Sequence, residues 1–230
     1  MNLQNELLKE MKVIMDKNEL LSDIAKQISV CKNCELHSSR KLSVPGEGPI
    51  ESRIMLIGEG PGFHENQQGR PFVGAAGKFL EELLEKAGLK RNEVFITNVV
   101  KCRPPGNRDP QEDELVACSQ YLDRQIKIIE PDVIVTLGRF SMAKFFGNVK
   151  ISQVHGQAKM IDGRLIVAMF HPAAALHQPA LKSTLLSDFA KLPDFLNQIT
   201  KKDEEIKKKN IENLAQKQEN SEQPTQLSLF

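Results

Sequence analysis

The chain has 230 residues, 40% of them hydrophobic, which suits one compact domain with appendages. Its formal net charge of +1 is uninformative about a nucleic-acid partner, so any basic surface must be local. No apolar run is long enough to span a bilayer, and charged residues near the N-terminus, such as Glu6 and Lys9, exclude a secretory signal. We therefore expect a cytoplasmic, monomeric protein without a membrane partner.

Residues 1–28 are predicted to form an N-terminal helical segment. Apolar side chains recur at helical spacing from Leu3 to Ile28, and Asp16 to Asn18 interrupt this pattern. A Cys-x-x-Cys pair follows directly after the segment.

A predicted strand then runs into a glycine-rich turn. Ile54 to Ile57 has the length and β-branched character of a buried parallel strand. The turn Gly58–Gly62 lets the backbone bend sharply and approach a ligand closely. Phe72 follows as a flat apolar surface, and a helix begins near Ala75. Open α/β sheets bind ligands where strands end in such turns, so we predict a pocket for a flat molecule with a polar edge.

Strands and helices alternate through the rest of the domain. In chain order, we predict a helix at 75–87, a strand at 94–100, a helix at 112–129, a strand at 133–137, a helix ending at 146, a hairpin from 160 into a strand at 165–170, and a helix at 181–199. This order predicts a single three-layer α/β/α domain over residues 29–199, with a central, mainly parallel four-stranded sheet. The loop at 101–110 is basic and rich in proline.

The composition changes after residue 199, where Lys, Glu, Asn and Gln dominate with balanced charges. We interpret residues 200–225 as a polar tether, either a solvated helix or flexible chain. The terminal residues 226–230, Gln-Leu-Ser-Leu-Phe, place apolar side chains after this polar segment, which suggests a binding partner.

The four cysteines are the candidate metal ligands. Cys31 and Cys34 form one close pair, whereas Cys102 and Cys118 lie on a predicted loop and on the helix after it. Four thiolates suit a structural zinc ion or an iron–sulfur cluster, and buried free cysteines are the alternative. Polar neighbours such as Lys32 favour metal ligation over burial. A zinc ribbon usually has a second close pair, so the spacing mildly favours a cluster.

Several motifs together resemble one known family. They are G-E-G-P-G at 58–62, G-R-P-F-V-G at 69–74, I-T-N-V-V-K-C-R-P-P at 96–105 and M-F-H-P-A at 169–173. With the four-cysteine pattern, they resemble the family 4 uracil-DNA glycosylases in order and spacing over residues 29–196. The resemblance implies an enzyme that hydrolyses the N-glycosidic bond of deoxyuridine in DNA, releases uracil and initiates base-excision repair. It also implies a [4Fe–4S] cluster on the four cysteines.

The resemblance further implies a role for each motif residue. Phe72 would stack on the flipped uracil, Asn98 would read its polar edge, and His171 would donate a hydrogen bond to uracil O2 as charge builds there. Backbone N–H groups at the glycine-rich turn would bind a uracil carbonyl. The implied uracil-binding residues are Glu59, Gly60, Pro61, Phe72, Asn98 and His171, and the implied catalytic residues are Glu59, Glu65 and His171.

One position departs from the wider superfamily. Where its best-known branch has an Asp that helps to activate water, this chain has Gly60. Glu59 or Glu65 could compensate, or the DNA phosphates and the uracil anion could stabilise the sugar cation. Glu65 could instead exclude the thymine methyl group. The sequence leaves these roles open.

Residues around the implied pocket mouth are candidates for DNA contact. Basic side chains on these loops would bind phosphates, and Leu176 resembles the apolar wedge that fills the gap left by the flipped nucleotide. The predicted DNA contacts are Arg70, Lys101, Arg103, Arg108 and Leu176. The other histidines, His37, His64, His155 and His177, are interpreted as surface residues.

The C-terminal pentapeptide resembles the short peptide by which bacterial proteins bind the sliding clamp of the replicative polymerase, the β subunit of DNA polymerase III. Leu227, Leu229 and Phe230 would enter an apolar pocket, and Gln226 would hydrogen-bond at its rim. The tether would let the catalytic domain search DNA while it is held at the clamp.

Two other classes of function are alternatives to the glycosylase hypothesis. A non-catalytic, metal-stabilised nucleic-acid-binding module would leave Asn98, Phe72 and His171 without a role. A nucleotide-binding enzyme would use the glycine-rich turn as a phosphate loop, but the chain lacks both the Rossmann glycine spacing and the Walker lysine and hydroxyl pair.

Overall fold

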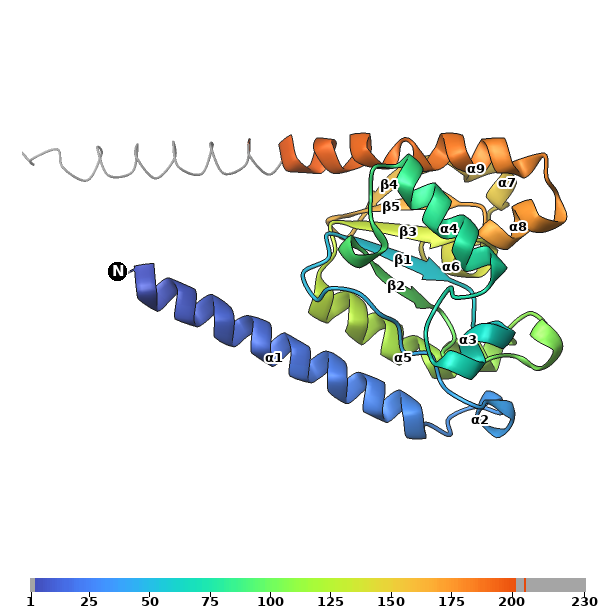
Figure 1. Cartoon of the computed structure of the whole chain (residues 1–230), viewed down its shortest axis with the longest axis horizontal. Coiled ribbons are helices and arrows are strands. Elements are labelled where there is room, and N and C mark those ends of the chain that lie inside the picture. Colours follow the sequence, from blue (N-terminus) through green and yellow to red (C-terminus); the bar gives the residue numbers. More distant parts are fainter. Residues whose placement is uncertain (1–2, 202–204, 206–230) are drawn as a thin grey trace, which may run out of the picture.

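The computed structural model describes residues 3–201 and residue 205, and side chains from residue 13 onward (Figure 1). Its centre is a five-stranded sheet in the order β2-β1-β3-β5-β4. The strands are β1 (Ile54–Gly58), β2 (Phe95–Asn98), β3 (Val133–Leu137), β4 (Gln157–Ile161) and β5 (Arg164–Met169). All neighbouring strands pair in parallel except β4 and β5, which form an antiparallel hairpin.

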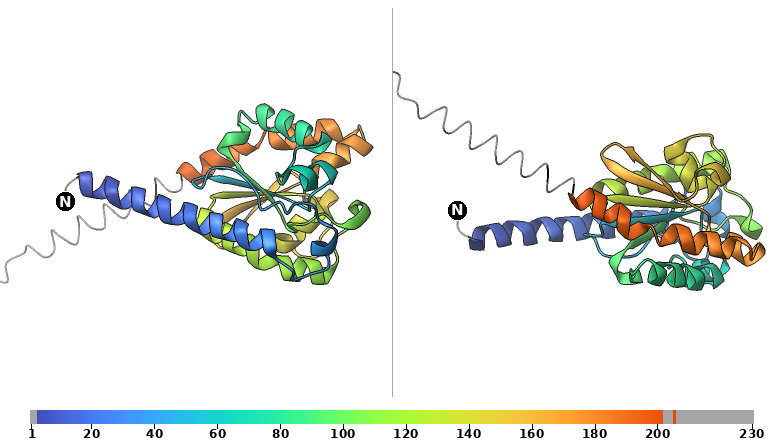
Figure 2. Two further views of the ribbon diagram at one scale, coloured as in Figure 1. Left: turned by 60° about the horizontal axis from the view of Figure 1, so that its bottom comes forward. Right: turned by 90° about the horizontal axis from the view of Figure 1, so that it is seen from above.

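Helices cover both faces of the sheet, so the predicted three-layer α/β/α fold is confirmed (Figures 1 and 2). On one face, α4 (Ala75–Lys86), α8 (Pro172–His177) and α9 (Leu181–Phe189) pack on alternate strand residues such as Leu56 and Val135. On the other face, α5 (Glu112–Ile129) and α6 (Arg139–Phe146) pack on the intervening residues such as Met55. Strands buried on both faces explain the continuous apolar runs in the sequence.

The predicted strand count of four was wrong by one edge strand. The fifth strand is β4, and its side chains are half-buried or exposed along its whole length. An edge strand with half-buried and exposed side chains carries little hydrophobic signal, and the sequence pattern indicated only its last residues. The turn between β4 and β5 contains Asp162 and Gly163, both at positive φ, as a tight hairpin requires.

Helix α1 (Leu3–Val30) is continuous, so the interruption predicted at Asp16 to Asn18 was wrong. Those residues are polar but include neither proline nor glycine, and a helix passes through such residues without a break. The second half of α1 packs on α5, where Ile24 and Ile28 are buried near the cysteines (Figure 1).

Smaller differences occur at other element ends. Strand β2 ends at Asn98, although the next two backbone N–H groups still donate to Gly58 at the end of β1 and to Glu59 directly after it. The predicted helix 181–199 is two helical stretches, α9 and residues 192–201. Short helices at α2 (Leu36–Ser39), α3 (Phe63–Gln68) and α7 (Ile151–Val154), and 3-10 turns at Arg91–Glu93 and Pro105–Asn107, were not predicted.

The described helices include none that is both long and apolar enough to cross a membrane. The predicted tether and the pentapeptide Gln226–Phe230 lie outside the described residues, apart from 200, 201 and 205.

Candidate active site

A pocket of about 510 Å³ opens at the carboxyl ends of the parallel strands. The turn after β1, the end of β2 and the segment after β5 all contribute to it, because parallel strands end at the same sheet edge. Its lining includes every predicted uracil-binding residue: Glu59, Gly60, Pro61, Phe72, Asn98 and His171. Glu65 and Arg108, the latter predicted at the pocket mouth, also line it, together with three residues that were not predicted there: Asn107, Asp109 and His177.

Asn98 presents an unsatisfied amide oxygen to this pocket. The residue is 2% exposed, and its Oδ1 is the only buried side-chain oxygen or nitrogen without a hydrogen-bond partner among the described residues. A buried acceptor without a partner is costly, so it marks a place where a ligand donor would be stabilised. A Cβ at Gly58 would lie 2.4 Å from this oxygen and 2.8 Å from the Phe72 ring, so only glycine permits their approach.

Phe72 lies beside Asn98 in a backbone conformation that is rare for an aromatic residue. Its φ is 49°, in the left-handed region, and its ring is 6% exposed. The ring stacks on His171 with a centroid distance of 5.5 Å and an interplanar angle of 25°. Strain of this kind persists only where the surrounding structure fixes the backbone.

His171 is held as a neutral imidazole at the start of α8. Its Nδ1 accepts a hydrogen bond from the Ala173 backbone N–H at 3.1 Å, so the ring proton lies on Nε2. Burial lowers the pKa of His171 from 6.5 to about 4, and the Glu65 carboxylate offsets only part of that shift. The ring can therefore act as a hydrogen-bond donor at neutral pH without carrying a charge.

The two candidate carboxylates differ in their partners. Oε1 of Glu65 accepts from the backbone N–H groups of Val73 at 2.8 Å and Gly74 at 2.9 Å, directly after Phe72. The side chain of Glu59 has no hydrogen-bond donor among the described residues. Burial raises the pKa of Glu59, Asp109 raises it further, and Arg139 partly opposes this. Glu65 thus supports the Phe72 loop, whereas Glu59 remains available inside the pocket.

Of the four basic side chains predicted to contact phosphates, three arginines lie at the surface and Lys101 is buried. Arg70 is exposed and pairs with Glu47, Arg103 donates to Asn107 at 2.8 Å, and Arg108 pairs with the buried Glu114 at 2.6 Å. Two apolar side chains are also exposed: Leu176 on α8 at 49% and Phe63 on α3 at 53%.

The prediction that Lys101 contacts DNA was wrong, because the side chain is only 1% exposed. Its Nζ donates to Thr97 Oγ1 at 2.6 Å, to the Asn98 carbonyl at 2.9 Å and to Gln125 Oε1 at 2.7 Å. All three ammonium donors are therefore used inside the protein, where burial lowers the pKa of Lys101 to about 8. These three hydrogen bonds stabilise the end of β2, where Asn98 lies.

The four cysteines line one small cavity between α1, α5 and the loop after β2, and they form no disulfide. N–H groups point at the sulfurs: Arg40 Nη1 lies 3.3 Å from Cys102 Sγ, and the Lys101 backbone nitrogen lies 3.3 Å from Cys118 Sγ. Such N–H···S contacts are typical around metal-bound thiolates. Burial raises the pKa of the Cys118 thiol to about 11.

The cysteine cavity is the candidate site for a metal group. Among the described side chains, no three His, Cys, Asp or Glu converge closely enough to hold one metal ion. The four thiols instead surround a shared space. Arg40 and Tyr121, which were not predicted, also line this cavity, as does His37, which was interpreted as a surface residue. His155, interpreted as a surface residue, pairs with the buried Asp188 at 2.7 Å.

Comparisons with known proteins agree with this geometry. A family model described as "Uracil DNA glycosylase superfamily" matches residues 45–193. The chain is 50% identical over 182 residues to a "Type-4 uracil-DNA glycosylase" of Sulfurisphaera tokodaii, covering 75% of this chain and 83% of that protein. It is 47% identical over 193 residues to the one of Saccharolobus solfataricus, with 80% and 88% covered. It is 45% identical over 184 residues to the one of Archaeoglobus fulgidus, with 76% and 92% covered.

Proposed function

This chain belongs to the uracil-DNA glycosylase superfamily, and we propose that it hydrolyses the N-glycosidic bond of deoxyuridine in DNA and so initiates base-excision repair. The single observation that carries the proposal is the buried, unsatisfied Oδ1 of Asn98, which lies beside the rings of Phe72 and His171 in one pocket. An acceptor that lacks a partner, next to a flat apolar surface, suits a base with a donor on its edge.

Base recognition follows from the two ends of the Asn98 amide. Oδ1 accepts from uracil N3–H, and Nδ2 donates to uracil O4. Cytosine has an acceptor at N3 and a donor at N4, the reverse of uracil. If cytosine bound here, its N4 amino group would face the Nδ2 donor of Asn98, and Oδ1 would remain without a partner. The Phe72 ring supplies the stacking face once the nucleotide has left the duplex.

Bond cleavage depends on where negative charge develops. As the C1′–N1 bond breaks, its electron pair moves into the uracil ring and the sugar becomes oxocarbenium-like. His171 donates from Nε2 to uracil O2, and because the imidazole is neutral it stabilises the anion without giving up its proton. Backbone N–H groups at Glu59 and Gly60 donate to a second carbonyl, as in an oxyanion hole.

Water must then add to C1′, and Glu59 is the better placed of the two carboxylates. Glu65 already accepts from two backbone N–H groups, whereas Glu59 faces the pocket without a donor among the described residues. We assign Glu59 to orient the water and accept its proton, and Glu65 to support the loop of Phe72.

The four cysteines would hold a [4Fe–4S] cluster, which here serves as a structural brace. Cys31, Cys34, Cys102 and Cys118 join the end of α1 to the loop after β2 and to α5. This places the brace directly after Asn98 in the chain, next to the basic loop. Loss of a thiolate should therefore affect folding and DNA contact before chemistry. The unpaired thiols also agree with a reducing, cytoplasmic location.

DNA contact is assigned to the exposed side chains around the pocket. Arg70, Arg103 and Arg108 each use part of the guanidinium for an internal partner, which orients the remaining N–H groups. Leu176 is the apolar wedge that fills the vacated stack. We propose that the enzyme acts as a monomer.

The C-terminal pentapeptide Gln226–Phe230 is assigned as a sliding-clamp-binding peptide on its sequence alone. Its deletion should abolish binding to a bacterial-type clamp and leave excision on short oligonucleotides unchanged. Clamp binding that survives the deletion would remove this assignment.

Free uracil distinguishes the enzyme from a non-catalytic binding module. We expect abasic sites in an oligonucleotide that contains deoxyuridine, and inhibition of their formation by added uracil but not by cytosine. Binding to that oligonucleotide without abasic sites, and without an effect of uracil, would favour the module. Iron and sulfide analysis of the same preparation, with a broad absorbance band near ~400 nm, tests the cluster.

A further inference from the structure

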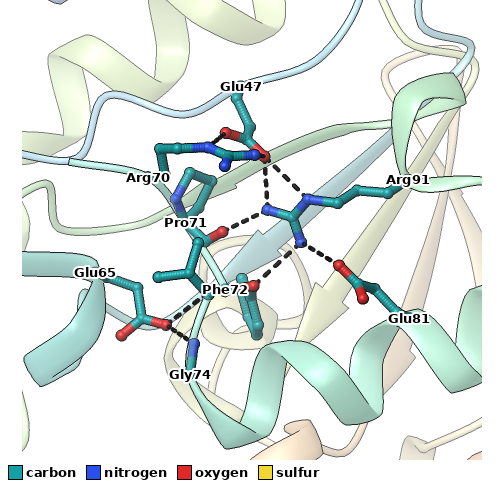
Figure 3. A network of polar contacts seen from close by, with 9 residues as sticks. Glu47, Glu65, Arg70, Pro71, Phe72, Gly74, Glu81 and Arg91 are labelled. Carbon is teal, nitrogen blue, oxygen red and sulfur yellow. Dashed lines mark hydrogen bonds and ion pairs between the residues drawn. The ribbon is translucent and has the colours of Figure 1, made fainter. Parts of the chain in front are cut away.

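A guanidinium outside the pocket holds the backbone of the stacking residue. Arg91, in the turn Arg91–Glu93, donates from Nη2 to the Pro71 carbonyl at 2.5 Å and from Nη1 to the Phe72 carbonyl at 3.1 Å (Figure 3). Its side chain is 19% exposed. Two consecutive carbonyls are therefore fixed by two nitrogens of one planar group, a fork geometry that a lysine lacks.

The same loop is fixed from its other end. Glu65 accepts from the next two backbone N–H groups, as described above, and Figure 3 shows the Glu65 and Arg91 contacts on either side of Phe72. Gly77 allows the loop to lie against α4, since a Cβ there would be 1.9 Å from the Phe72 carbonyl oxygen. Together these contacts account for the persistence of the left-handed conformation of Phe72.

Arg91 also connects this loop to the strand that carries Asn98. Its Nε and Nη2 donate to Glu47 Oε1 at 3.0 and 2.6 Å. The backbone of Glu47 is paired with Ile96 on β2 in both directions, at 3.0 and 2.8 Å. Asn98 ends β2 two residues later. One ion pair thus links the two side chains that would contact the base.

We propose that the Arg91–Glu47 ion pair is a positioning device for base excision, which fixes the Phe72 ring relative to the Asn98 amide. The inference rests on the proposed glycosylase function. Neither residue lines the pocket, so Arg91 acts through Phe72 rather than on the substrate. A displacement of about 1 Å in a reacting constellation costs on the order of 100-fold in rate, which is the scale of effect that such a device controls.

A double-mutant cycle measures this coupling. Single-turnover excision is measured for the native chain, Arg91→Ala, Phe72→Ala and the double variant. We expect Arg91→Ala to slow excision by roughly 10- to 100-fold, and the same change to cost less than about 3-fold when Phe72 is already absent. Arg91→Lys should stay close to Arg91→Ala, because it keeps the charge but loses the planar fork.

Arg53→Ala serves as the matched control. Arg53 pairs with Asp132 at 2.5 Å at the opposite end of β1, so its loss removes an ion pair of the same kind without touching the Phe72 loop. Its excision rate should equal that of the native chain. Melting temperature and visible absorbance of every variant are recorded, and if Arg91→Ala does not fold, Glu47→Gln replaces it in the cycle.

Equal losses for Arg91→Ala in both backgrounds, or native activity in Arg91→Ala, would overturn the proposal. Failure of the proposed function looks different, because the native chain and Arg53→Ala would then release no uracil at all.

Discussion

Replacing His171 by asparagine removes one donor from the pocket and keeps the helix cap. Nδ1 of His171 accepts from the Ala173 N–H, and an asparagine oxygen can cap α8 in the same way. Asparagine is too short to place a donor where Nε2 lies. A preorganised donor aimed at developing negative charge is typically worth ~3 kcal/mol, or a factor of 10²–10³ in rate. We expect His171→Asn to slow single-turnover excision by about this factor.

A second variant separates the donor from the cap. His171→Ala loses both, so it should match His171→Asn in excision rate and be less stable than it by about 1 kcal/mol. The assay is single-turnover release of uracil, with denaturant unfolding of both variants in parallel. Excision by His171→Asn within roughly 3-fold of native would refute the assigned role, since the loss of a transition-state donor must appear in this step.

Four further predictions concern pH, the base-reading amide and the cysteines. Because the pKa of His171 is lowered to about 4, protonation of this ring should not lower excision as pH drops through 6.5, and a fall there that disappears in His171→Asn would contradict the neutral donor. Below pH 6.5 the unfolded chain binds a proton at His171 that the folded chain does not bind. The free energy of unfolding should therefore decrease toward pH 4 by at most about 3 kcal/mol, and by less in His171→Asn. Asn98→Asp should reduce uracil excision by roughly 100-fold or more in the single-turnover assay, because a buried carboxylate repels uracil O4, and an unchanged rate would remove the reading role. Cys118→Ser should lose the visible absorbance and lower the melting temperature, whereas a coloured, native-like variant would show that this thiol is not a ligand.

The three layers of the fold, and the edge of the sheet at which the pocket lies, could be predicted from the sequence. Continuous apolar runs such as Ile54 to Ile57 identify buried parallel strands, and the glycine-rich turn after β1 marks where they end. The start of strand β4 was missed because no side chain of this edge strand is fully buried. Continuity of α1 through Asp16 to Asn18 depends on helix propensity, which an apolar pattern does not report.

Only those pocket residues that belong to a recognised sequence motif could be predicted from the sequence. Lys101 looked like a phosphate contact because it stands beside Cys102 and Arg103 in a basic loop, yet three internal acceptors surround its Nζ. Burial of a lysine depends on partners such as Gln125, far along the chain, and spacing does not reveal them. Arg91 escaped notice for the same reason, because its partners lie on separate loops.

The central claim is that this pocket removes uracil from DNA. The most direct measurement is the release of free base from an oligonucleotide with a single deoxyuridine, quantified by mass spectrometry beside the abasic sites formed. We expect one uracil for each abasic site, and no base from a matched oligonucleotide with deoxycytidine at that position. Bound but intact deoxyuridine DNA, with no free uracil, would contradict it.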